Sequence, residues 1–304
     1  MGTGFGPLQV MLREQLFVLN QRRRLHRIAR YWHPSVDPTA MLETVRRKTL
    51  IVTVSAGRSG TTYLAHLLAA FPQTTSLHEA APHYAFFMRQ AQHSPAAARR
   101  FLLEYKLPCI AAAPTPRYAD ISHLFCKGFL EPLLELGIVP RVVMLRRDPH
   151  LVARSWLTRR VIPGRWKRGL KLHLHPGDPG VLPFAKWWRA SDYQLCFWYA
   201  LEIERRQRAY GMLLDGIGGT WIDVTPEELH DPQRFLTMGR QLSLLDDDTP
   251  TAPLLERHRE LSSVLHKVNT RPPASWLPEE EEAVWEAVAP HAPWLRQEVA
   301  RRYG

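Results

Sequence analysis

A short loop at residues 55–62 has the residue types and spacing of an anion-binding turn. It reads Ser-Ala-Gly-Arg-Ser-Gly-Thr-Thr, follows the β-branched run 50–54 and precedes a leucine-rich helical pattern at 60–71. A strand, a glycine turn and a helix start in this order aim backbone N–H groups at one negatively charged group. We therefore predict that a phosphate-like group binds here. The predicted contacts are Gly57, Arg58, Ser59, Gly60, Thr61 and Thr62.

This loop departs from the usual nucleotide-binding sequence GxxxxGK[ST], in which Lys contacts the outer phosphates and Ser or Thr contacts Mg²⁺. Ser55 stands at the position of the first Gly, and Thr61 stands at the position of the Lys. The strong cation of the loop, Arg58, lies inside it instead. A kinase without that Lys lacks the main positive charge on the transferring phosphate. The loop thus indicates an anion other than ATP–Mg²⁺, with an ordinary glycine turn as the alternative.

A second anion site is predicted after the apolar run 142–145. In enzymes that use a Mg²⁺-nucleotide, such a strand commonly ends in an Asp that helps to hold the metal. Here it ends in Arg146-Arg147, and Asp148-Pro149 follow as a helix cap and first helical residue. We expect Arg147, with Ser155 two helical turns later, to bind a second phosphate. We expect no metal site, and a solvated arginine pair is the alternative.

Together the two motifs resemble those of sulfotransferases that use 3′-phosphoadenosine 5′-phosphosulfate (PAPS). Residues 58–62 are similar to the loop that binds the 5′-phosphosulfate in that family. Residues 145–149 with Ser155 are similar to its 3′-phosphate site. The resemblance covers about residues 49–225. It implies a P-loop-like sulfotransferase fold, PAPS as co-substrate, 3′-phosphoadenosine 5′-phosphate (PAP) as product, and catalysis without a metal.

The resemblance also suggests catalytic residues. Glu79 follows the short strand pattern 74–78, and it resembles the Glu that acts as base in the tyrosyl-protein and carbohydrate branches of the family. Burial could raise its pKa into a useful range. His78 is the alternative base, because the cytosolic branch uses a His. Lys127, after a predicted strand at 121–126, and Arg58 are expected to stabilise the transferred group.

Further contacts to the nucleotide are expected from the polar C-terminal stretch 262–271, in which Asn269 and Arg271 are the candidates. The acceptor is expected to be a hydroxyl or amine on a small molecule, sugar or peptide, and nucleic acid is not expected as a partner. Two other functions stay open. One is a P-loop nucleotide-dependent kinase, and the other is a non-enzymatic basic protein that binds nucleic acid or a membrane surface.

The elements that must position these residues alternate between strand and helix patterns. This alternation predicts an α/β fold in which helices flank a central parallel sheet, with ligands bound at the carboxyl ends of the strands. The predicted strands are 49–54, 74–78, 121–126, 141–146 and 219–224. The predicted helices are 60–71, 95–106, 130–136, 149–160, 185–210, 226–240 and 278–300. The domain is expected to span 47–304, with an irregular insertion at about 161–185.

Residues 1–46 are predicted to form a basic, largely helical extension. Residues 1–48 carry nine Lys or Arg against three acids, which is more than half of the net charge of +11. Weak contact with an anionic membrane is one interpretation of this excess. We favour a helix that packs on the domain through an apolar set: Leu12, Leu16, Leu19 and Ile28.

The composition agrees with a cytoplasmic protein. The chain has 304 residues, of which 45% are hydrophobic, but no run of about 18 apolar residues that would suggest a membrane span. Cys109, Cys126 and Cys196 are scattered and form no CxxC pair, which favours a reducing compartment. We therefore expect a cytoplasmic location.

Overall fold

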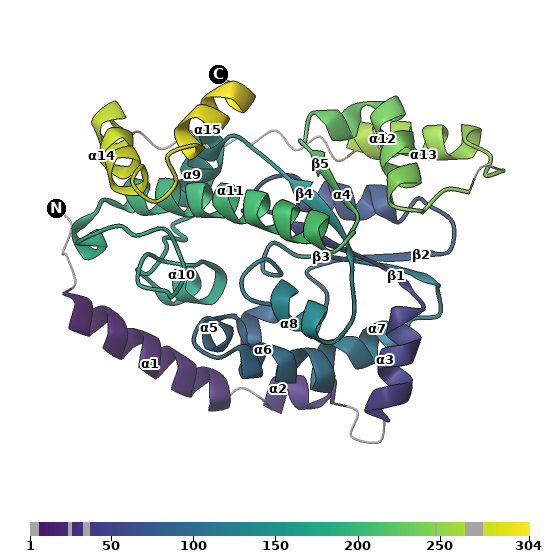
Figure 1. Cartoon of the computed structure of the whole chain (residues 1–304), viewed down its shortest axis with the longest axis horizontal. Helices are drawn as coiled ribbons and strands as arrows, with labels where there is room; N and C mark the ends of the chain where they lie inside the picture. The colour runs from purple at the N-terminus through teal and green to yellow at the C-terminus, as the bar shows by residue number, and fades with distance from the viewer. Residues whose placement is uncertain (1–5, 24–25, 33–36, 247, 265–275) are drawn as a thin grey trace.

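A central sheet of five parallel strands organises the chain (Figure 1), as the α/β prediction required. The computed structural model describes residues 6–23, 26–32, 37–246, 248–264 and 276–304. The strands are β1 (Thr49–Val54), β2 (Thr74–His78), β3 (Arg117–Ile121), β4 (Arg141–Leu145) and β5 (Trp221–Val224). Their order across the sheet is β2-β3-β1-β4-β5.

Strand β1 lies at the centre and pairs with β3 on one side and β4 on the other. The chain first builds the β2–β3 side and then crosses to the β4–β5 side, so the strand order reverses at β1. In open parallel sheets, ligands bind outside the carboxyl ends of the strands at such a switch point. The topology therefore places the loop that follows β1 at the favoured ligand position.

Both faces of the sheet are covered, which explains why β1 is mostly apolar and β4 carries the apolar run 142–145. Leu50, Val52 and Val54 of β1 belong to one hydrophobic core. Ile51, which points to the other face, belongs to a second core. The alternation of side chains along a strand thus divides one apolar run between two helical layers.

The second core packs three helices against the sheet, namely α4 (Thr61–Leu68), α12 (Pro232–Gln241) and α13 (Ala252–Val264). The first core packs most of the others, and Figure 1 shows the long α11 crossing in front of the sheet. The remaining helices are α1 (Pro7–Arg23), α2 (His26–Ala29), α3 (Pro38–Arg46), α5 (Met88–Ala91), α6 (Pro95–Phe101), α7 (Leu107–Ala112), α8 (Leu130–Glu135), α9 (Pro149–Thr158), α10 (Lys167–Leu172), α11 (Asp192–Gly216), α14 (Pro278–Val288) and α15 (Leu295–Tyr303).

The prediction of the third strand at 121–126 is wrong. Strand β3 covers 117–121, and residues 122–127 form turns. Asp120 lies inside the strand, where it is buried and pairs with Lys106 at 2.8 Å. The charge of Asp120 interrupts the apolar pattern of β3, so the more apolar segment 121–126 was predicted as the strand instead. Phe125 in that run is buried, but it packs from a turn.

Three helix predictions also need correction. The helix expected at 226–240 is α12, which begins at Pro232 after a short 3₁₀ turn at Glu228–His230. The helix expected at 278–300 is interrupted between α14 and α15, where Pro290 and Pro293 lie. Proline removes a backbone donor and clashes with the preceding helical turn. The helix expected at 185–210 is α11, which begins later because Ser191 and Gln194 form a capping box.

The N-terminal helix packs on the domain, but with a different face from the one predicted. Val10 and Phe17 of α1 are buried, whereas the leucines expected to pack, Leu12, Leu16 and Leu19, are exposed. Ile28 in α2 is buried, as predicted. Within the residues that the structure describes, no helix combines the length and the apolar character that a membrane crossing requires.

Candidate functional site

The loop between β1 and α4 is a series of left-handed residues held by internal hydrogen bonds. Gly57, Arg58 and Gly60 have φ values of 72°, 61° and 83°. The N–H of Gly57 donates to the Ser55 hydroxyl at 3.0 Å, and the Ser59 hydroxyl donates to the Gly57 carbonyl at 3.1 Å. Successive backbone N–H groups in this conformation form a concave site for an anion, next to a helix start.

The two predicted anion motifs, almost ninety residues apart in sequence, are in direct contact. Arg58 Nε donates to the Ser155 hydroxyl at 3.0 Å, and Arg147 Nη1 donates to the Arg58 carbonyl. Burial, together with the nearby charges of Arg159 and Arg147, lowers the pKa of Arg58 to about 10. The structure therefore brings Arg58, Arg147 and Ser155 together in one positively charged site.

Arg146, the neighbour of Arg147, belongs to the scaffold instead. Its side chain is buried and bonds Glu204 Oε2 at 2.6 Å and Asp223 Oδ1 at 2.8 Å. By contrast, Arg147 Nε is buried without a hydrogen-bond partner among the described residues. Of the two arginines that follow β4, Arg146 is neutralised by Glu204 and Asp223, whereas Arg147 contacts the Arg58 loop.

Glu79 lies directly after β2 with a left-handed φ of 50°. Its Oε2 accepts from the Ser122 hydroxyl at 2.8 Å, and its Oε1 lies 2.7 Å from His123 Nδ1. Burial alone would raise the pKa of Glu79, but the charge and hydrogen bond of His123 outweigh it and lower the pKa to about 2. The carboxylate therefore stays ionised and is a weak base, contrary to the expectation of a raised pKa.

His123 is the site residue that the sequence did not reveal. Its Nε2 is buried and has no hydrogen-bond partner among the described residues. The ring lies against the loop, since a Cβ added to Gly57 would stand 3.1 Å from it. Burial and the nearby charge of Lys127 lower the pKa of His123. A neutral ring that donates Nδ1–H to Glu79 leaves the Nε2 lone pair free beside the loop.

His78, the alternative base, contacts the helix start. Its Nε2 lies 3.0 Å from the Thr61 hydroxyl, and burial lowers the pKa of this histidine. His78 and Glu79 thus both reach the site, from opposite sides of the strand end. Thr62, the next residue of α4, is exposed.

Lys127 lies deeper than predicted. It is fully buried, its Nζ donates to the Leu172 carbonyl, and it stands 4.9 Å from the centre of the Tyr199 ring. The Tyr199 hydroxyl in turn donates to the Ala56 carbonyl at 3.0 Å. Burial lowers the pKa of Lys127 to about 7. The lysine is therefore behind the loop, not at the end of a strand.

The insertion at about 161–185 packs into the domain and supplies part of this inner layer. His173, which follows α10, is fully buried between Trp156 and Tyr199, with ring centres 4.4 Å from each. Asn269 and Arg271, the C-terminal candidates, lie outside the described residues. At the near end of their stretch, Ser262 Oγ is 2.6 Å from the Tyr63 hydroxyl of α4.

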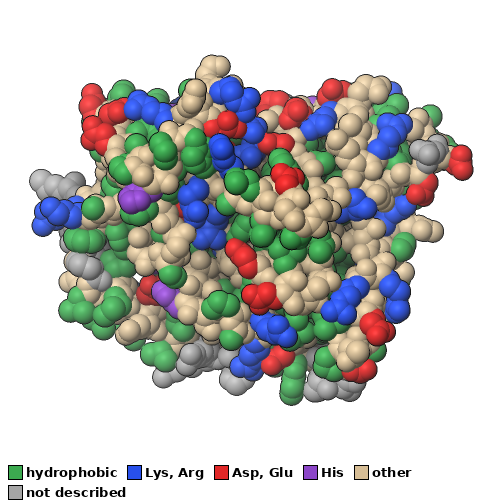
Figure 2. Space-filling view, in the orientation of Figure 1, with side chains coloured by type: hydrophobic (Ala, Val, Ile, Leu, Met, Phe, Trp, Pro, Cys, Tyr) green, Lys and Arg blue, Asp and Glu red, His purple; other side chains and the backbone are tan. Residues whose placement is uncertain are grey.

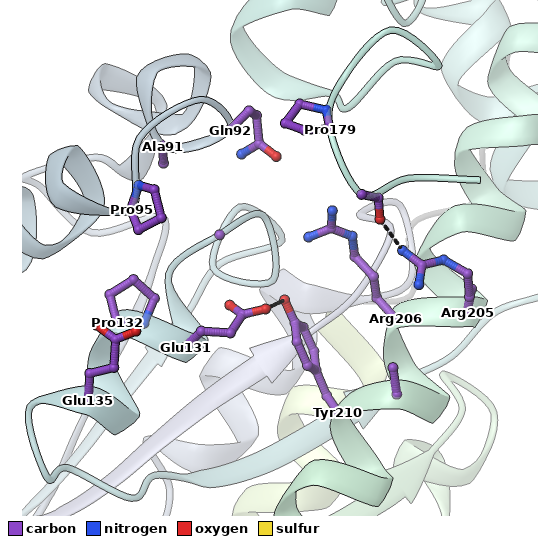
Figure 3. A pocket seen from close by; sticks show the side chains of 13 residues that line it. Ala91, Gln92, Pro95, Glu131, Pro132, Glu135, Pro179, Arg205, Arg206 and Tyr210 are labelled. Carbon is purple, nitrogen blue, oxygen red and sulfur yellow. Dashed lines mark hydrogen bonds between the residues drawn. The ribbon is translucent and has the colours of Figure 1, made fainter. Parts of the chain in front are cut away.

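Two other polar groupings hold none of the predicted site residues. Glu14, His93 and Asp178 could together offer ligands to a metal ion, but the Arg89 guanidinium bonds both carboxylates and supplies their positive charge. A cavity of about 400 Å³ opens beside α11 (Figure 3). Its lining includes Glu131, whose carboxylate accepts from the Tyr210 hydroxyl at 2.9 Å.

A comparison with models of known protein families and with curated proteins finds no match. What the site can do therefore follows from its chemistry. The left-handed loop, the start of α4 and two arginines form a cradle for anionic groups. The free Nε2 of His123 beside that cradle can accept a proton.

Proposed function

We propose that the chain is a sulfotransferase that moves a sulfuryl group from PAPS to a hydroxyl or amine acceptor. The observation that carries the proposal is the contact of the Arg58 loop with Arg147 and Ser155. In this proposal, residues 56–62 hold the 5′-phosphosulfate, while Arg147 and Ser155 hold the 3′-phosphate. Charge-assisted hydrogen bonds from arginine suit both groups. The fold is then the P-loop-like sulfotransferase fold.

His123 is the proposed base, and Glu79 is its positioning residue. The Glu79 carboxylate holds the Nδ1–H of His123, so Nε2 accepts the acceptor's proton as the new S–O bond forms. The bond between sulfur and the 5′-phosphate oxygen breaks, and its electron pair leaves with PAP. Arg58 and the buried cation of Lys127 stabilise negative charge on the sulfuryl and leaving oxygens. This assignment replaces Glu79 as the base because Ser122 and His123 engage both of its carboxylate oxygens and lower its pKa.

The kinase alternative lacks groups that it would need. Thr61 occupies the lysine position of the loop, and β4 ends at Leu145 before two arginines. The next acid, Asp148, caps α9 by accepting from the His150 N–H at 2.8 Å. A basic surface protein without activity would account for the net charge of +11, but not for a half-buried Glu79–His123 pair beside an anion loop.

Ligand-dependent unfolding tests the proposal. We expect PAP without Mg²⁺ to stabilise the protein by about 2.7 kcal/mol at one hundred times its Kd. ATP with Mg²⁺ should have little effect, and the opposite result would contradict the proposal and favour the kinase. Turnover is then measured as the mass gain of one SO₃ group across sugar, phenol, alcohol and amine acceptors.

A further inference from the structure

Helix α1 exposes an unusual apolar face. Five large side chains along it are between 47% and 63% exposed: Leu8, Met11, Leu12, Leu16 and Leu19. Their spacing of three and four residues places them on one side of the helix. From residue 8 to residue 19 this leucine face extends about 17 Å. No charged residue interrupts it, because Gln15 is the polar residue that falls within the same arc.

The opposite face of α1 is anchored, so the leucine face cannot turn inward. Val10 and Phe17 are buried, and Gln21 Nε2 donates to the Ala85 carbonyl at 2.8 Å. Glu14 Oε1 lies 3.2 Å from the buried guanidinium of Arg89. Arg89 also pairs with the buried Asp178, so Glu14 joins α1 to a buried ion pair of the domain and helps to hold this side of the helix in place. The orientation of the leucine face is thus imposed by the packing of the other side.

Basic side chains flank the leucine face. Arg27 of α2 and Lys167 and Lys171 of α10 line a groove together with Phe17 and Asn20 of α1. Figure 1 shows α1 along the outside of the molecule with α10 above it. In Figure 2, hydrophobic side chains gather at the lower left, where α1 lies in Figure 1. The surface therefore combines a leucine row with positive charge at its margin.

An exposed tryptophan stands beside the basic groove. Trp166, directly before Lys167 and α10, is 55% exposed. Tryptophan is enriched where a protein meets the headgroup layer of a membrane, because its ring is apolar and its N–H is polar. A helix with one apolar face and basic residues beside it is typical of proteins that lie in that layer.

We propose that the leucine face of α1 docks on an anionic lipid surface, with the basic groove of α2 and α10 contacting the headgroups. A second copy of the chain is disfavoured as the occupant, because each copy carries a net charge of +11 and two like-charged surfaces repel each other. A lipid surface instead supplies the opposite charge. The proposal does not depend on sulfuryl transfer.

Co-sedimentation with vesicles tests the docking surface. The wild-type protein should bind vesicles of phosphatidylcholine mixed with phosphatidylserine, and less so as salt rises. Leu12→Glu with Leu16→Glu should weaken binding roughly tenfold or more, since a single charge near an anionic surface already changes affinity about fivefold. Both side chains are exposed, so the melting temperature should stay near the wild-type value.

Val139→Glu with Met212→Glu is the matched control, because both residues are exposed apolar side chains outside this surface. The control should bind vesicles within about twofold of wild type. The proposal is overturned if the wild-type protein does not bind the phosphatidylserine vesicles. It is also overturned if the control loses as much vesicle binding as the leucine variant. It is also overturned if sedimentation of the protein alone shows a dimer that only the leucine variant disrupts, because a second copy is then the occupant.

Discussion

Gly57 is where the anion loop meets the proposed base, and replacing it with alanine tests the packing of the site. The added Cβ would stand 2.9 Å from Trp156 Cζ2 and 3.1 Å from two carbons of His123. Real Cβ atoms do not approach carbon that closely, so a ring or the loop must move. Trp156 cannot easily retreat, because its Nε1 donates to the Ala56 carbonyl at 3.1 Å. We expect the loop to shift and the anion cradle to distort.

The expected loss of stability has two parts. At a φ of 72°, a side chain at Gly57 costs roughly 1–2 kcal/mol in backbone conformation. The contact with Trp156 adds an overpacking cost of roughly 1–3 kcal/mol. Gly57→Ala should therefore lower the free energy of unfolding by roughly 2–5 kcal/mol. Urea unfolding followed by tryptophan fluorescence measures this change.

Gly218→Ala separates the two parts. Gly218 has a similar φ of 66°, but an added Cβ there would meet nothing within 4 Å. It should lose the backbone part alone, roughly 1–2 kcal/mol, and bind PAP as wild type does. Gly57→Ala should also lower the affinity for PAP in calorimetry. If the two variants unfold alike and both bind PAP normally, the close packing at Gly57 does not shape the loop.

The other predictions concern charge and pH. Arg147→Ala should weaken PAP binding roughly tenfold to a hundredfold, which is the effect of losing charge-assisted hydrogen bonds. Arg168→Ala is the control, because Arg168 is exposed, and it should leave PAP binding unchanged. Equal affinities of the two variants by calorimetry would show that Arg147 is not part of the site. The release of PAP from PAPS with water as acceptor should have two pH limits. On the acid side, kcat/KM should decrease as His123 gains a proton, at a lower pH than an ordinary histidine because its pKa is lowered. On the alkaline side, kcat/KM should decrease above about pH 7 as Lys127 loses its proton. Glu79→Gln should slow turnover and move the acid limb to lower pH, since the carboxylate raises the pKa of His123; an acid limb near pH 2 in the wild type would instead return the role of base to Glu79.

Sequence alone predicted the parts of the site whose signals are local. The apolar run of β1, the loop glycines and the leucines of α4 lie within twenty residues, so their order already implies a strand, a turn and a helix. The same holds for β4 and α9, where Asp148 and Pro149 mark the helix start as predicted. Because both strands are parallel neighbours, their carboxyl ends had to meet.

His123, the proposed base, could not be predicted, because its position depends on a strand with a nonlocal partner. Asp120 interrupts the apolar pattern of β3, and it is tolerated because Lys106 and the Tyr84 hydroxyl bind it. The residues next to Asp120 in sequence do not indicate that Lys106 and Tyr84 bind it. Shifting the strand to 121–126 put His123 inside it, where alternation would have decided its direction. In the structure, His123 follows the strand and can turn towards Glu79.

The leucine face of α1 was missed for a related reason. The helix is apolar on two sides, and periodicity alone cannot tell which side packs. Polar contacts decide it: Glu14 and Gln21 must reach Arg89 and Ala85, which lie far along the chain. The apolar residues on the same side as Glu14 and Gln21 are therefore buried, and the leucines face outward.

Arg146 and Arg147 are neighbours in sequence, but the fold gives their positive charges different surroundings. Glu204 from α11 and Asp223 from β5 neutralise Arg146, although neither is near it in sequence. Arg147 and Arg58 form no salt bridge within the described part of the chain, and Arg147 Nη1 donates to the Arg58 carbonyl. Burial and the charges of Arg159 and Arg147 lower the pKa of Arg58. The surroundings of Arg58 thus disfavour its charged form, and an anion bound beside it would favour that form again. The net charge of +11 could suggest many anionic partners, whereas the proposal of a ligand with two phosphate-like groups rests on Arg58 and Arg147 beside a helix start.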